Sequence, residues 1–153
     1  MLRLARRVRD VDLLPTAAEF DYRPNGVIYV RSPHALGAYP PRITERLEYW
    51  AAHAGGRTFL AHRNATGDWD RLTYAETLAR VRAIAQGLLD RKLPTARPIA
   101  ILSGNSLDHA LLALAALYVG IPHVPIAPAY SLAAADFATL RYVWQLIEPT
   151  LVF

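Results

Sequence analysis

The residues best placed to do chemistry follow a short apolar run in the second half of the chain. Residues 98–102 read PIAIL, and residues 103–106 read SGNS. A glycine-containing turn between a strand and a helix can present backbone amides to a phosphate. This turn has one glycine and no lysine, and neither the GxGxxG nor the Walker pattern occurs in the sequence. We therefore expect Gly104 to permit the turn and Asn105 and Ser106 to satisfy free helix amides, with a direct ligand role as the alternative.

Histidines are the other candidates for chemistry. They show neither HExxH nor paired metal spacing, and they stand at His34, His53, His62, His109 and His123. We expect each to be a surface or packing residue. A nucleophilic triad could be drawn from Ser103, His109 and Asp108, but Asp108 is expected at the positive end of a helix dipole and no GxSxG elbow is present. We reject this triad and predict no catalytic, cofactor-binding or metal-ligating residue in the chain.

The positive charge of the chain is concentrated at its start. The net charge of +4 is supplied by Arg3, Arg6, Arg7 and Arg9. The other 13 basic side chains balance the 13 acidic ones, so the body of the protein has no summed field to attract a polyanion. We predict no nucleic-acid partner and interpret the basic head as a solvated start. A transit segment, or a surface for nucleic acid or membrane, is the alternative.

Composition indicates a packed globular protein, with 53% hydrophobic and 20% charged residues. Cysteine is absent, which excludes disulfides and thiolate catalysis and fits a cytoplasmic location. Residues 110–135 carry no Asp, Glu, Lys or Arg, but Gly120 and three prolines interrupt them. A bilayer needs about 20 continuous apolar residues. We therefore predict buried core here and no membrane partner.

The second half of the chain alternates strand and helix patterns. Ser106 is expected to cap a helix that is apolar nearly all round, Gly120 to end it, and Ser131 to cap a later helix. The expected order is a strand at 98–102, a helix at 106–119, a strand at 123–126, a helix that stops before Pro149 and a strand at 151–153. This order predicts an α/β fold, with right-handed crossovers and a mainly parallel sheet that has helices on both faces.

The first half is expected to be less regular. Residues 1–41 are interpreted as an irregular arm with at most one short strand, led by an Asn-Gly turn, and residues 42–153 as the folded domain. The domain should open with a helix from Ile43, with Thr44 as its N-cap. A β-hairpin over 58–74 follows, as a turn-forming NATGD lies between two strand-like runs.

Thr73 and Glu76 have the spacing of a capping box. We therefore expect a helix to begin at Thr73. Pro94 cannot continue it, so the helix should extend no further than Leu93. Its apolar side chains lie along one face, which predicts a surface helix that covers the sheet.

Three stretches of the chain resemble the N-terminal part of the adenylate-forming acyl-CoA synthetase family. They are RLTYAETLARVRAIAQGLLDRKL at 71–93, RPIAILSGNSLDHALLALAALYVGIPHVPIAPAYS at 97–131 and LIEPTLVF at 146–153. The likeness runs from about residue 42 to the end. Residues 31–69 and 103–131 are especially similar to feruloyl-CoA synthetases, which activate a plant-derived hydroxycinnamate.

The resemblance implies a two-step reaction that uses ATP, magnesium and coenzyme A: a carboxylate forms an acyl-adenylate, and coenzyme A then displaces AMP. The family's lysine-containing phosphate loop, ribose-binding acid, magnesium ligand and adenylation lysine have no counterpart in residues 1–153. Only architecture carries over, namely the turn at 103–106 and the strand and loop at 124–130. We therefore expect this chain to bind none of these cofactors and to be inactive by itself.

Two functions remain open from the sequence. The first is an incomplete N-terminal subdomain of an AMP-forming acyl-CoA ligase, from a truncated gene or a cut product. Its partner would be the rest of the ligase or a second copy, joined at an open sheet edge and at apolar helix faces over 110–117 and around Trp144. The second is a non-catalytic α/β module that binds a small ligand or a partner chain.

Overall fold

The structure is a computed structural model that describes residues 17–153. These residues form two units, separated between Tyr39 and Pro40. The four arginines of the basic head lie outside the described residues. The functional division into residues 1–41 and 42–153 stays a prediction, because compactness alone assigns no role to either part.

The first unit contains a hairpin where the sequence predicted at most one short strand. Strand β1 (Glu19–Tyr22) pairs antiparallel with β2 (Ile28–Arg31). The predicted turn before β2 is present, and Gly26 has a φ of +81° there. The sequence pattern misses β1 because acidic residues are unfavourable in strands. Here Glu19 accepts a 2.8 Å hydrogen bond from Arg31 across the pair, which offsets that preference.

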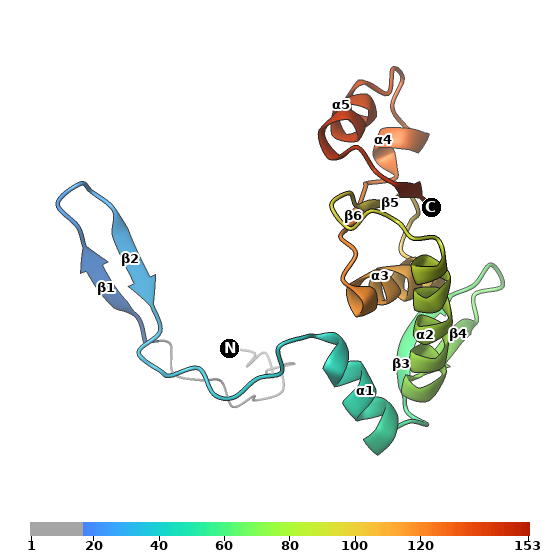
Figure 1. The fold of residues 1–153 in the computed structure, drawn as a ribbon, viewed down its shortest axis with the longest axis horizontal. Helices are drawn as coiled ribbons and strands as arrows, with labels where there is room; N and C mark the ends of the chain where they lie inside the picture. The colour runs from blue at the N-terminus through green and yellow to red at the C-terminus, as the bar shows by residue number, and fades with distance from the viewer. Residues whose placement is uncertain (1–16) are drawn as a thin grey trace, which may run out of the picture. The chain divides into compact units, whose positions relative to one another are not determined.

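The second unit opens with a helix, a hairpin and a longer helix (Figure 1). These are α1 (Thr44–His53), β3 (Thr58–Arg63), β4 (Trp69–Thr73) and α2 (Tyr74–Asp90). Strands β3 and β4 pair antiparallel, which confirms the predicted hairpin. The capping box is also confirmed, since the Thr73 hydroxyl accepts from the Glu76 amide at 3.2 Å and the Glu76 carboxylate accepts from the Thr73 amide at 2.9 Å.

One predicted helix boundary in this part is wrong and another is confirmed. Thr44 is the first residue of α1 and not its N-cap, which is Ile43. The Thr44 side chain is buried in the first turn of α1 and makes no capping hydrogen bond. Its position therefore reflects packing and not capping. Helix α2 ends at Asp90, within the predicted limit of Leu93, and Lys92 then takes a left-handed backbone with a φ of +49° that does not continue the helix.

The rest of the chain builds a parallel sheet. Its elements are β5 (Ile99–Ile101), α3 (Leu107–Val119), β6 (His123–Pro125), α4 (Ala129–Leu132), α5 (Ala138–Ile147) and β7 (Leu151–Val152). The strand order is β6-β5-β7, and both pairings are parallel. The connection through α3 leads from β5 out to β6, and the connection through α5 leads back from β6, past β5, to β7. Since the two connections run in opposite directions along the sheet, the same handedness puts α3 and α5 on opposite faces, as Figure 1 shows. The predicted α/β fold is confirmed.

The predicted cap of the last helix is wrong. Ser131 lies inside the short helix α4, where its hydroxyl donates to the Pro128 carbonyl at 3.2 Å. Helix α5 begins seven positions later, at Ala138, whose amide donates to Asp136 Oδ1 at 3.0 Å. The first amides of a helix have no intrahelical acceptor, so this bond satisfies a free donor at the start of α5. Phe137, which lies between Asp136 and Ala138, has a left-handed backbone with a φ of +55°.

The core lies where α2 and α3 pack together and against the sheet. Its buried members are Leu47, Leu72, Val81, Ala85, Leu88, Ile99, Ile101, Leu111, Leu112, Ala115, Ala116 and Ile121. Helix α5 contributes none of them, and Trp144 and Leu146 on it remain 41% and 69% exposed. In residues 17–153 no helix has the length and apolar character that crossing a bilayer requires.

Candidate functional site

A hollow of about 400 Å³ lies at the carboxyl ends of β5 and β6. Ligands of parallel α/β sheets bind at this end of the strands. One wall is the turn after β5 with the first turn of α3, and the other is the loop after β6. The lining residues are Ser103, Gly104, Asn105, His109, Pro125, Ile126, Ala127 and Pro128. Because this hollow includes the SGNS turn, it is the candidate functional site.

The polar centre of the hollow is a contact between Ser103 and His109. Ser103 Oγ lies 3.0 Å from His109 Nδ1, and the Ser103 carbonyl oxygen lies 3.3 Å from the same nitrogen. Both residues are half-buried. A serine hydroxyl beside an imidazole is the first pair of a nucleophile and its base. Ser103 therefore holds His109 Nδ1 in place and leaves Nε2 available to a ligand.

The third member of the rejected triad lies elsewhere. Asp108 is exposed and lines a separate groove of about 440 Å³, together with Arg91, Leu112 and Phe153. Successive residues of a helix point about 100° apart, so Asp108 and His109 face different surroundings. The structure brings Ser103 and His109 together without a carboxylate to orient the imidazole. That the chain has no catalytic residue stays a prediction.

The SGNS turn differs in part from its predicted form. Ser106 caps α3 as predicted, since its hydroxyl accepts from the His109 amide at 3.1 Å. Gly104 lies outside the left-handed region, and a Cβ added there would meet nothing within 4 Å, so the turn does not require glycine. Asn105 is exposed and makes no side-chain hydrogen bond within residues 17–153, so it satisfies no helix amide. Its amide group is therefore available at the edge of the hollow.

A second histidine near this site adds no charge to it. His123 is the first residue of β6 and is half-buried. Burial, and to a smaller extent the charge of His109, lowers the pKa of His123. His123 therefore stays neutral at physiological pH and adds no positive charge near the hollow.

The other histidines make no cluster with carboxylates. His53 Nδ1 lies 2.7 Å from the Tyr49 carbonyl oxygen, and the His53 ring stacks on Tyr49 with centroids 4.0 Å apart. His34 and His62 are exposed. Among residues 17–153, no three His, Cys, Asp or Glu side chains gather closely enough to hold a metal ion.

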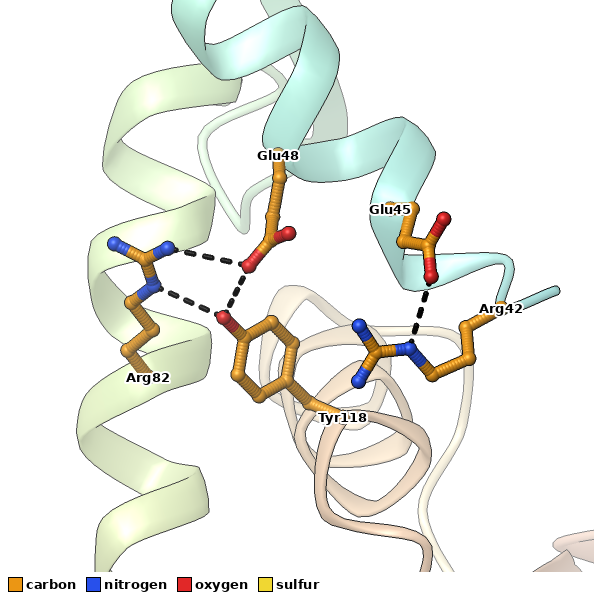
Figure 2. Close-up of polar contacts among 5 residues, drawn as sticks. All are labelled: Arg42, Glu45, Glu48, Arg82 and Tyr118. Atoms are coloured by element: carbon orange, nitrogen blue, oxygen red, sulfur yellow. Dashed lines mark hydrogen bonds and ion pairs between the residues drawn. The ribbon is translucent and has the colours of Figure 1, made fainter. Parts of the chain in front are cut away.

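A second polar cluster connects three helices on the side shown in Figure 2. The Tyr118 hydroxyl of α3 donates to Glu48 Oε1 of α1, and Arg82 of α2 donates from Nε to Tyr118 at 3.1 Å and from Nη2 to Glu48 at 3.2 Å. The hydrogen bond from Tyr118, and then the one from Arg82, lowers the pKa of Glu48. The cluster holds α1 against α2 and α3.

Sequence reasoning misses the cluster of Glu48, Arg82 and Tyr118, and it groups Ser103 with His109 only in the triad that it rejects. Glu48, Arg82 and Tyr118 lie on three separate helices, so no local spacing relates them. Ser103 and His109 are six positions apart, and they meet because the short turn between β5 and α3 folds back on the first turn of the helix. A signal for the second contact does exist in the sequence: a polar residue at a predicted strand end and a histidine in the first turn of the next helix.

The comparisons with known proteins agree with this architecture. Residues 47–153 match the family of AMP-binding enzymes, and the chain belongs to this family. Among solved structures, the chain is similar to a fatty acyl-adenylate ligase from L. pneumophila, solved with acyl adenylate and pyrophosphate. The identity is 19% and the TM-score 0.63, over 72% of this chain and 19% of that chain. At this identity the likeness shows the fold alone.

Two further structures show the same fold. The first, McyG A-PCP complexed with phenylalanyl-adenylate, is 19% identical with a TM-score of 0.64, over 76% of this chain and 18% of that chain. The second is the luciferase-like enzyme from the nonluminescent Zophobas morio mealworm, 18% identical with a TM-score of 0.60, over 76% of this chain and 27% of that chain. No curated protein matched the sequence. The chain thus spans roughly a fifth to a quarter of the length of these structures.

Proposed function

We propose that this chain serves as part of the N-terminal domain of an ATP-dependent, adenylate-forming ligase. The substrate is ferulate or a related hydroxycinnamate, which is converted to an acyl-adenylate and then to a coenzyme A thioester. The rest of such a ligase is its partner. The observation that carries this proposal is the family match over residues 47–153, which includes the whole β6-β5-β7 sheet. The likeness of residues 31–69 and 103–131 to feruloyl-CoA synthetases supports the choice of acid.

The role of this part is to support the reaction and not to perform it. Adenylation requires positive groups around the phosphates, and each such group supplies several kcal/mol of transition-state stabilisation, about 3–4 for a single donor. The only lysine of the chain is Lys92, which follows α2 and does not line the hollow. We therefore propose that the 153-residue chain has no ligase activity by itself, and that ATP, magnesium and coenzyme A are bound by the whole enzyme. The absence of cysteine supports a cytoplasmic location.

Two measurements test the proposal together. The DNA after the codon for Phe153 is read, and any longer open frame is expressed beside the 153-residue chain. ATP–pyrophosphate exchange is then measured with ferulate, and with acetate as the control acid. We expect exchange with ferulate from the longer product only. Exchange by the short chain would disprove its inactivity, and a longer product without a lysine-containing phosphate loop would disprove the ligase assignment.

A non-catalytic binding module is the second candidate. The hollow of about 400 Å³ favours it, because Asn105 and one His109 nitrogen are available to a ligand there. Thermal shifts with ATP, AMP, coenzyme A and ferulate discriminate the two functions. A saturable shift that is lost in Asn105→Ala and His109→Ala would favour a module. No shift with any of the four would leave the ligase part as the better account.

A further inference from the structure

The β3–β4 hairpin exposes two arginines beside a tryptophan on the face that points away from the core. Side chains alternate along a strand. Leu60 and Leu72 are paired in the register and face the core, so the pairs Arg63 with Trp69 and Ala61 with Arg71 lie on the outer face. Trp69 is 44% exposed, and both arginines are exposed. We call Arg63, Trp69 and Arg71 the outer arginine face.

Both guanidinium groups of this face are held in position. Arg63 Cζ lies 4.8 Å from the centre of the Trp69 ring, and Arg63 Nη1 donates to the Gly67 carbonyl at 2.9 Å. Arg71 Cζ lies 6.0 Å from the same ring, and its Nη1 donates to the Trp69 carbonyl at 3.3 Å. Each arginine thus has restricted rotamers while its other N–H groups remain free to donate. A side chain ordered in advance loses less entropy when it binds.

No carboxylate of residues 17–153 forms an ion pair with the arginines of this face. None of the ion pairs of the described residues includes Arg63 or Arg71. The hairpin has two acidic residues, and both are bound elsewhere: Asp68 accepts from Thr66 at 3.0 Å, and Asp70 accepts from Asn64 at 3.0 Å. Both aspartates keep their charge, but neither forms an ion pair with Arg63 or Arg71, so the two guanidinium groups beside the exposed indole remain open to a carboxylate from outside.

Aromatic side chains continue from the same hairpin toward α1. Phe59 of β3 stacks on Tyr74 with centroids 4.6 Å apart, and Tyr74 lies 6.3 Å from Trp50. Phe59 and Trp50 are 36% and 40% exposed. Tryptophan, tyrosine and arginine are the residues in which binding hot spots are enriched. The composition of this surface is therefore that of a protein interface.

We propose that the outer arginine face and these aromatic residues bind an acidic segment of a protein partner. The partner's carboxylates pair with Arg63 and Arg71, and its apolar side chains contact Trp69 and Phe59. Charge complementarity determines this choice of partner. A nucleic acid fits less well, because beyond the first nine residues the chain has equal numbers of basic and acidic side chains and no extended field for a polyanion. The proposal is independent of the ligase function.

A designed peptide tests the proposal on the 153-residue chain. The probe is a fluorescein-labelled peptide in which Glu and Tyr alternate, and its binding is followed by fluorescence anisotropy at physiological salt. The comparison peptide has Gln in place of Glu. The double variant R63Q/R71Q removes the two charges, and R80Q/R141Q is the matched control, because Arg80 and Arg141 are exposed and lie outside this hairpin. Circular dichroism verifies that both variants fold.

We expect the acidic peptide to bind and the Gln peptide to bind at least about tenfold more weakly. R63Q/R71Q should weaken the binding of the acidic peptide about tenfold, while R80Q/R141Q should change it less than about twofold. Equal weakening by both variants would show non-specific attraction and overturn the proposal. Absence of binding by the acidic peptide would overturn it too. Tighter binding of a labelled oligothymidine, lost in R63Q/R71Q, would assign the surface to nucleic acid instead.

Discussion

The Tyr118 hydroxyl donates a hydrogen bond to Glu48 Oε1, which connects the end of α3 to the middle of α1. The two residues are 70 positions apart in the sequence. Arg82 bonds both of them, so the contact belongs to one network of three side chains (Figure 2). Helix α1 buries only Thr44 and Leu47, so this network is an important part of its attachment to the second unit.

Tyr118→Phe should weaken the attachment of α1. The substitution removes the donor to Glu48 and the acceptor for Arg82, and it leaves the ring in place. A half-buried hydrogen bond contributes about 1 kcal/mol to the free energy of unfolding, and we expect a loss of that size. Urea denaturation measures it. Tyr142→Phe is the control, because Tyr142 is 65% exposed and makes no hydroxyl hydrogen bond within residues 17–153. Equal effects of the two variants would contradict the role of Tyr118.

The same network should make stability depend on acid pH. The hydrogen bonds from Tyr118 and Arg82 lower the pKa of Glu48 in the folded chain below its value in the unfolded chain. Ionised Glu48 therefore stabilises the fold above the unfolded pKa, and this contribution is lost as the pH falls from the ordinary glutamate pKa through the lower folded pKa. Glu48→Gln should show a smaller decrease in the free energy of unfolding over that range.

The control for the pH experiment is Glu148→Gln, which removes the exposed pair between Glu148 and Arg97. Exposed pairs contribute little to stability, so this variant should keep the acid dependence of the wild-type chain. Carboxyl chemical shifts of Glu48 followed by NMR give its pKa directly. An unchanged acid dependence in Glu48→Gln, or the same pKa of Glu48 in Tyr118→Phe, would contradict the mechanism.

Serine, but not alanine, should be able to replace Thr73 in the capping box of α2. Thr73→Ala removes the acceptor of the Glu76 amide and one hydroxyl donor to the Glu76 carboxylate. The loss of an N-cap costs about 1 kcal/mol of unfolding free energy, whereas Thr73→Ser keeps the hydroxyl and should cost less than half of that. Chemical denaturation of both variants measures the difference. Similar losses in the two would show that the Thr73 methyl, and not its hydroxyl, sets the stability of this helix end.

Local sequence patterns predict most of the second unit, because its elements are specified by nearby residues. The Thr73–Glu76 box, the cap at Ser106 and the left-handed Gly120 each mark a helix end correctly. The apolar run PIAIL becomes β5, the central strand, which is completely buried as such runs predict. These signals act within a few residues, so they are readable without knowledge of the fold.

The failures arise where distant residues or burial override the local preference. Thr44 is buried and therefore cannot serve as the cap that its type suggests. β1 forms because it pairs with β2 across an ion pair that its own residues do not reveal. The candidate site is also predicted only in part. The turn at 103–106 is predicted from the sequence, but the hollow has a second wall, the loop after β6, and it is the pairing of β5 with β6 that places this loop beside the turn.

Substitution by alanine should destabilise the chain at Gly120 and have little effect at Gly104. The comparison tests whether the turn before α3 and the C-terminal end of α3 each require a glycine. Gly120 ends the helix with a φ of +75°, where its amide donates to the Ala116 and Leu117 carbonyls. A Cβ in the left-handed region costs about 1–2 kcal/mol, so Gly120→Ala should lower the free energy of unfolding by that amount. Gly104 has neither a left-handed φ nor a close neighbour, so Gly104→Ala should stay within about 0.5 kcal/mol of wild type. Urea denaturation of both variants measures the contrast. A large loss in Gly104→Ala would mean that the turn after β5 needs a glycine after all, and a neutral Gly120→Ala would mean that α3 can end before β6 without the left-handed residue.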